Sequence, residues 1–222
     1  MVDELRRTFH DRLADLHALV GAMVASAGAA VSAATAALLE GNVDDAHLVA
    51  VANKALVADN EAVEREVLDL LALQGPVASD LRLLMASLRV AHEAELSASL
   101  AASLAARAGR LDAEVLTIRL RASLHDLGAE AAQLLARAGQ AYAVLDGALA
   151  AQVRESNGAV RRLHRHFLAE LFTLDRPPVE AAVELGVVAR CYERIGDHAL
   201  EIADRVSFVA NSVTIPPDGS PA

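Results

Sequence analysis

Aromatic residues are scarce in this chain, and their scarcity indicates how the core is built. They make up 3% of the sequence, with four Phe, two Tyr and no Trp, although hydrophobic residues make up 54%. Ala and Leu supply most of that apolar content. Sheets draw on aromatic and β-branched residues, whereas Ala and Leu are among the best helix formers. The composition therefore predicts closely packed helices.

Proline is equally sparse and is confined to a few places. The six prolines are Pro76, Pro177, Pro178, Pro216, Pro217 and Pro221. Proline interrupts the interior of a helix, so these positions mark turns and a tail. The long stretches between them are free to be helical.

Cysteine and signal-peptide features are nearly absent. The single cysteine, Cys191, excludes an internal disulfide and fits a reducing compartment. The segment from Met1 to Arg12 is charged throughout and has no apolar run of the kind that a signal peptide needs. We therefore expect a cytoplasmic protein in which Cys191 is a small packing residue.

Basic residues are outnumbered. Twenty Lys and Arg stand against thirty Asp and Glu, which gives a formal net charge of −10. A nucleic-acid binder normally shows a basic face, and the nearest feature here is a short run from Arg161 to His166. We interpret that run as a solvated helix face or a local partner contact, and we expect no nucleic-acid partner.

One segment lacks charge altogether. From Leu16 to Leu39 there is no Asp, Glu, Lys or Arg, a length sufficient to span a bilayer. The segment is mostly Ala with Gly, Ser and Thr mixed in, and Ala contributes little hydrophobic drive. The composition favours a buried helix of a bundle over a transmembrane helix.

Breakers divide the chain into six predicted helices. The expected ranges are 3–40, 44–73, 77–108, 111–145, 148–174 and 179–212, followed by a loose tail over 214–222. Helices one to three and four to six share features: Gly41 and Gly147 follow similar sequences, and Glu95 matches Glu193. The fold class that we predict is all-α, with two tandem three-helix bundles over 1–109 and 110–213.

Acidic residues gather on one face of the sixth predicted helix. Glu193, Asp197, Glu201 and Asp204 fall within about a quarter of the helix circumference. An apolar seam lies nearly opposite them, formed by Val188, Tyr192, Ile195, Ala199, Ile202, Val206, Val209 and Val213. We therefore expect the four acids to form an outward, negative surface, and we predict that Glu193, Arg194, Asp197, Glu201 and Asp204 dock a partner.

Two motifs resemble those of a known family. The string Glu-Arg-Ile-Gly-Asp-His-Ala stands intact from Glu193 to Ala199, and a second family-like stretch runs from Leu71 to Arg82. In both, the chain resembles the PhoU family of bacterial phosphate-uptake regulators. The resemblance implies two similar three-helix bundles and negative control of phosphate uptake and of the phosphate-starvation response. It implies two partners, the ATPase subunit of the phosphate transporter and a sensor histidine kinase, which would place the protein at the membrane periphery. A second copy of the chain, forming a homodimer, is a further expected partner.

The resemblance also implies a metal site. In that family, carboxylates on neighbouring helices hold metal ions, and Glu193 and Asp197 match those positions in the second repeat. The expected ion is iron or another divalent or transition metal. The neighbouring helix carries Arg161 where the family has an acid, and the first repeat offers Ser99 in place of Asp197. Surface ion pairs with nearby arginines are the alternative for the same acids.

Catalytic motifs are missing from the sequence. Glycines stand singly, so no phosphate-binding loop is formed, and Ser, His and Asp show no nucleophile signature. We therefore expect no enzymatic activity. Two alternatives to a phosphate regulator stay open: a carboxylate metal-binding bundle of the di-iron kind, and a helical adaptor with a different partner.

Overall fold

The computed structural model describes residues 2–76, 78–110, 115–175 and 177–210. These residues form six α-helices and no strand, which confirms the predicted fold class. In chain order the helices are α1 (Val2–Glu40), α2 (Val43–Gln74), α3 (Ala78–Ala105), α4 (Ile118–Val144), α5 (Gly147–Leu171) and α6 (Val179–Ala210). The predicted tail over 214–222 lies outside the described residues.

Local capping explains most of the helix ends. Gly41 has a φ of 68°, which favours glycine, and the side chain of Asn42 accepts hydrogen bonds from the backbone N–H groups of Asp44 and Asp45. Asp146 caps α5 in the same way. The predicted start of the fourth helix was wrong: α4 begins at Ile118, because the Thr117 hydroxyl caps it by accepting from the N–H of Leu120.

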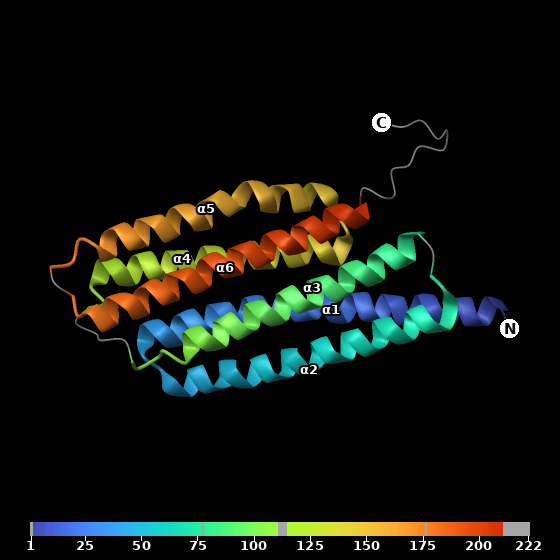
Figure 1. Ribbon diagram of the computed structural model, residues 1–222, viewed down its shortest axis with the longest axis horizontal. Helices are drawn as coiled ribbons and strands as arrows, with labels where there is room; N and C mark the ends of the chain where they lie inside the picture. The colour runs from blue at the N-terminus through green and yellow to red at the C-terminus, as the bar shows by residue number, and fades with distance from the viewer. Residues whose placement is uncertain (1, 77, 111–114, 176, 211–222) are drawn as a thin grey trace.

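The helices form two bundles that lie side by side (Figure 1). Helices α1, α2 and α3 pack on one another, as do α4, α5 and α6. Between the bundles α1 packs on α4 and α3 packs on α6, so that α2 and α5 lie on the outside. The α3–α6 pair is antiparallel, since Glu93 contacts His198 while the later Arg107 contacts the earlier Glu184.

Helix α1 packs as a core helix. Its apolar positions Leu16, Val20, Val24 and Val31 are buried, and it contacts α2, α3 and α4. By length and composition it also meets the criteria for a membrane span, with a mean hydropathy of 1.7 over its most apolar window. Of that window 56% is buried inside the protein, which is the behaviour of a bundle helix.

The two tyrosines of the chain join the two bundles. The Tyr142 hydroxyl on α4 lies 2.7 Å from Ser87 Oγ on α3, and the Tyr192 hydroxyl on α6 lies 2.9 Å from Thr35 Oγ1 on α1. Both rings are fully buried. Burial raises the pKa of both phenols, so each stays neutral and can donate or accept. Both tyrosines therefore lie at the junction between the bundles.

Candidate functional site

The buried seam of α6 lies where the sequence places it. Val188, Tyr192, Ile195, Ala199, Ile202, Val206 and Val209 are all buried. The last predicted member, Val213, falls outside the described residues. The seam faces the core of the molecule, and the acidic side chains are turned away from it.

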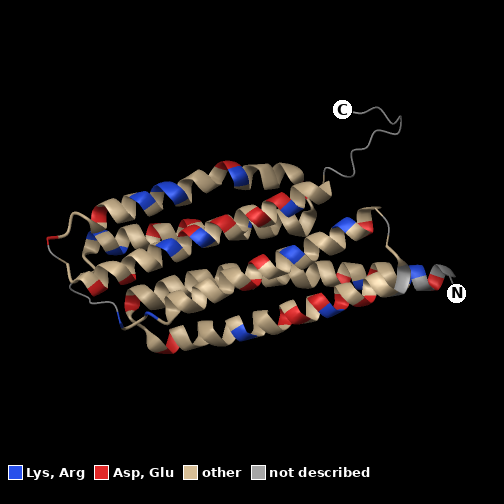
Figure 2. Cartoon of the chain, in the orientation of Figure 1, with Lys and Arg blue, Asp and Glu red and all other residues tan. Residues whose placement is uncertain are grey.

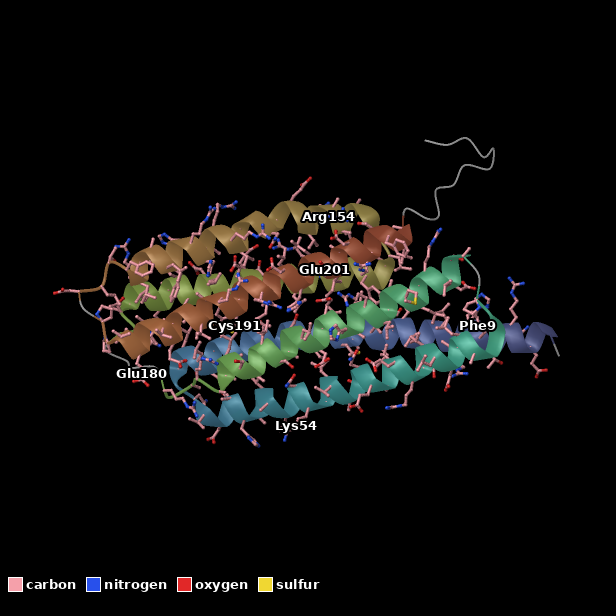
Figure 3. The ribbon with its side chains drawn as sticks, viewed as in Figure 1. Phe9, Lys54, Arg154, Glu180, Cys191 and Glu201 are labelled. Atoms are coloured by element: carbon pink, nitrogen blue, oxygen red, sulfur yellow. The ribbon has the colours of Figure 1, made fainter. Side chains whose placement is uncertain are left out.

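The four acids of α6 each pair with an arginine, which is the alternative that the sequence left open for them. On α5, Arg154 Nε lies 2.6 Å from Asp204 Oδ1, and Arg161 Nη2 lies 3.2 Å from Asp197 Oδ1. Within α6, Arg205 reaches Glu201 at 3.6 Å. Charges of both signs lie along α5 and α6 in Figure 2, and Figure 3 labels Arg154 and Glu201 on these neighbouring helices.

Glu193 differs from the other three acids by its burial. Its side chain is 18% exposed, against 42%, 46% and 49% for Asp197, Glu201 and Asp204. It pairs with Arg190 on its own helix and lies 3.9 Å from Nδ1 of His164 on α5. Glu193 therefore belongs to the contact between α5 and α6. Three side chains of α5 lie beside three acids of α6: Arg154 beside Asp204, Arg161 beside Asp197 and His164 beside Glu193. We name these three pairs the α5–α6 ion-pair row.

Arg194 lies on another side of α6. It is exposed, and it lines a groove between α6 and α3 together with Cys191. Among the side chains that the structure describes, none forms an ion pair with it. The predicted docking residues are therefore split between two surfaces of one helix.

The side chains around Glu193 and Asp197 are unsuitable for the predicted metal site. Within the described residues, no group of three or more His, Cys, Asp or Glu side chains is placed to hold an ion. Glu193 and Asp197 each face an arginine, and a guanidinium opposes a bound cation. His164, whose Nδ1 lies 3.9 Å from Glu193 Oε2, adds one imidazole donor. These residues do not fit a carboxylate metal centre.

The matching place in the first repeat carries one carboxylate, Glu95, among neutral polar side chains. Glu95 accepts a hydrogen bond from Asn60 Nδ2 at 3.3 Å, and Ser99 Oγ donates to Asn53 Oδ1 at 3.2 Å. Glu61 of α2 does not join them, since it pairs with Arg65 on its own helix. Asn53 and Asn60 therefore lie where a metal site would need a second carboxylate.

Gly196 has a packing role. A Cβ built on it would lie 3.2 Å from Val160 Cγ1 and 3.3 Å from Asn157 Oδ1, both on α5. Of the two roles open to this glycine, admitting a neighbouring helix or leaving room for a ligand, the structure supports the first. The glycine lets α5 approach α6 closely along the ion-pair row.

A buried hydrogen bond between a histidine and a glutamate joins the bundles, and the sequence contains no pattern that predicts it. Nδ1 of His198 lies 2.6 Å from Oε2 of Glu93, and both side chains are almost fully buried. A carboxylate only accepts, so Nδ1 carries the hydrogen. Burial raises the pKa of Glu93, but the hydrogen bond from His198 and the charges of His198 and Arg89 outweigh it, and the net shift is downward. The pair ties α3 to α6 across 105 residues of sequence.

A second polar cluster was also missed. Glu170 on α5 is buried, and it accepts from Ser123 and from Arg119 Nε, the latter at 2.8 Å. His166 lies 3.4 Å from the same carboxylate. The hydrogen bond from Ser123 and the nearby cations lower the pKa of Glu170 against the opposing effect of burial. This cluster fixes α5 on α4, as Glu93 and His198 fix α3 on α6.

Charge pairing and burial determine the chemistry of these sites. The carboxylates are neutralised by neighbouring cations, and burial raises the pKa of the Cys191 thiol, which disfavours the nucleophilic thiolate. What α6 offers is a surface of defined charge on rigid helices.

Comparison with known proteins identifies related chains. A model of the PhoU domain matches residues 20–108 and 124–206. The phosphate-specific transport system accessory protein PhoU homolog 1 of Mycobacterium bovis is 34% identical, with 94% of this chain and 96% of that protein covered. PhoU homolog 2 of Mycobacterium tuberculosis is 32% identical, with coverage of 93% and 98%.

Two solved structures have the same fold as this chain. The crystal structure of PhoU from Pseudomonas aeruginosa superimposes with a TM-score of 0.85 at 27% identity, covering 91% of this chain and 99% of that one. The phosphate transport system regulatory protein PhoU from Streptococcus pneumoniae gives a TM-score of 0.83 at 20% identity, which is a likeness of fold.

Proposed function

The chain belongs to the PhoU family, and on this premise we propose that it is a phosphate-responsive regulator that restrains phosphate uptake and the phosphate-starvation response. It acts in the cytoplasm by binding the ATPase subunit of the phosphate transporter and a sensor histidine kinase. The observation that carries the proposal is the end-to-end match to relatives named as accessory proteins of phosphate-specific transport.

In this mechanism the protein binds its partners and catalyses no reaction. Rigid helix faces bind a partner in one of its conformations and thereby shift its population toward that conformation. The protein needs no catalytic group for this, and it reaches the membrane only through its partners.

The docking surface is on the second bundle. Asp197, Glu201 and Asp204 are between two-fifths and half exposed, so their outer oxygens stay accessible beside the arginines that pair with them. Arg194 adds an exposed cation on the same helix. Glu193 lies deeper, and its contribution is to hold α5 in place.

Binding and physiology together test the function. Purified transporter ATPase and sensor kinase from the same organism are titrated with the protein, and a deletion strain is scored for phosphatase induction in high phosphate. We expect binding to at least one partner and unrestrained induction in the deletion strain. Normal repression in that strain, with no binding, would instead favour an adaptor with a different partner.

The second-repeat carboxylates bind no metal in this proposal. Elemental analysis of the wild type and of Glu193→Ala/Asp197→Ala should give the same substoichiometric metal content, because arginines already neutralise both acids. Iron or manganese near one equivalent in the wild type, lost in the variant, would restore the metal prediction and favour a carboxylate metal protein.

A further inference from the structure

An apolar groove runs between α3 and α6, away from the α5–α6 ion-pair row. It has a volume of about 370 Å³, and its floor is formed by Leu100 on α3 and by Val183, Val187 and Cys191 on α6. Val183 is 59% exposed and Val187 is 38% exposed, so the groove is open along its side. Figure 3 labels Cys191 at this level of α6. We name it the α3–α6 groove.

Gly186 leaves the middle of this groove empty. A Cβ built on it would meet nothing within 4 Å. Glycine is unfavourable inside a helix, and no neighbouring group of this chain requires it here, in contrast to Gly196 against α5. Counting back equally from Glu193 and from Glu95 pairs Gly186 with Leu88 of the first repeat, which packs against the core. The second repeat thus keeps open a space that the first repeat fills with leucine.

The rim of the groove is cationic on a protein whose net charge is −10. Arg190 and Arg194 line it. Arg190 pairs with Glu193, and the nearby Arg107 pairs with Glu184 at 2.8 Å. Arg194 has no ion-pair partner among the described residues, so it supplies the uncompensated charge. It is close enough to Cys191 to act electrostatically on the buried thiol.

We propose that the α3–α6 groove docks an acidic amphipathic helix of a partner protein. An aliphatic side chain of that helix fills the space over Gly186, and a carboxylate about two turns away pairs with Arg194. The open side of the groove suits the ridge of a helix, whereas a small molecule is normally enclosed on most of its surface. This inference rests on the proposed function, for which it names the chemistry of the partner segment.

The test uses methyl-labelled full-length protein and two designed helical peptides. Both peptides carry the same leucine row; glutamates flank it in one and lysines in the other. We expect the glutamate peptide to shift the methyl resonances of Leu100, Val183 and Val187, with an affinity that falls as salt rises. The lysine peptide should leave them unchanged. Absence of these shifts, or equal shifts from both peptides, overturns the proposal.

Matched variants locate the contact. Gly186→Leu should weaken binding at least tenfold by filling the space, and Gly21→Leu is its control, because a Cβ at Gly21 also meets nothing within 4 Å but lies on α1. Arg194→Glu should weaken binding similarly, with Arg165→Glu, an exposed arginine of α5, as control. Unchanged binding in Gly186→Leu, or methyl shifts that depend on protein concentration alone, would assign the groove to something other than an acidic helix.

The same variants separate this inference from the proposed function. If the transporter ATPase or the kinase binds the wild type and Gly186→Leu equally, the groove inference fails while the function stands. If the glutamate peptide binds in the groove and neither protein binds the wild type, the function fails while the groove stands.

Discussion

At the scale of single residues, alanine substitutions at two glycines of α6 should change the stability of the protein in opposite directions. Gly186 has open space above it, so Gly186→Ala should stabilise the protein by up to about 1 kcal/mol through helix propensity alone. Gly196 faces buried Val160 and Asn157 at 3.2–3.3 Å, so Gly196→Ala should destabilise by about 1–2 kcal/mol, because the overpacking exceeds the same propensity gain. Urea unfolding of both variants measures the difference. Equal stabilisation would mean that α5 yields to the extra methyl group.

The pair of Glu93 and His198 makes the second prediction at this scale. His198→Ala leaves a buried carboxylate with Arg89 alone, at 3.4 Å, and should cost about 3 kcal/mol of unfolding free energy. Glu93→Gln, which keeps the size of the side chain and removes the charge, should cost less. Urea denaturation at neutral pH measures both costs, and equal values would argue against an uncompensated carboxylate.

The same pair predicts a dependence on pH. The pKa of Glu93 is lowered from 4.5, so its stabilisation is fully present above that value and is lost as the pH falls through the lower pKa of the folded state. The wild type should therefore lose more stability than Glu93→Gln between pH 5 and the acid limit of folding. Parallel pH profiles of the two proteins would contradict the assignment.

At the scale of elements, the α5–α6 ion-pair row predicts modest, paired effects. Asp197→Arg alone should destabilise by no more than about 1 kcal/mol, since both partners are about half exposed. Adding Arg161→Asp should recover most of that loss and leave helicity unchanged. A double-mutant cycle in low and high salt measures the coupling. A coupling near zero at low salt would show that the row orients charge for a partner and does not hold α5.

The contrast between what the sequence revealed about α6 and what it missed has a physical cause. Helical periodicity predicted the buried seam from Val188 to Val209, because that pattern depends on one helix alone. It placed the acids on the other side and left ion pairs open as an alternative. It could not identify Arg154 and Arg161 as the partners, since both approach from a different helix. The Glu93–His198 contact joins residues with no local pattern between them, and so no periodicity could indicate it.

Helix ends follow the same logic. Gly41 and Asn42 identify the first turn because their effects are local. The start of α4 depends on a single Thr117 cap within an otherwise helix-compatible stretch, and the sequence placed it too early. The Glu170 cluster escaped notice because Arg119, Ser123 and His166 come together only after α5 packs on α4.

At the scale of the whole molecule, the bundles share one core. Buried apolar side chains of α1 and α3 pack on α4 and α6 in a continuous cluster, and polar contacts cross the junction, among them Thr35–Tyr192, Ser87–Tyr142 and Glu93–His198. Separating the bundles would expose that apolar surface and remove Ser87, Thr35 and His198 from their partners Tyr142, Tyr192 and Glu93. The sequence repeat therefore need not correspond to two independent folding units.

The circular dichroism of the tyrosines can measure whether the two bundles unfold together. Both tyrosines lie at the junction, and the chain has no tryptophan. Tyrosine circular dichroism in the near ultraviolet therefore reports separation of the bundles, while the far-ultraviolet signal reports melting of all six helices. We expect the two transitions to coincide in urea, as two-state unfolding requires. In Thr35→Val, which removes the hydroxyl facing Tyr192, both should shift together to lower urea. A tyrosine transition that comes first would mean that the bundles part while their helices are still folded.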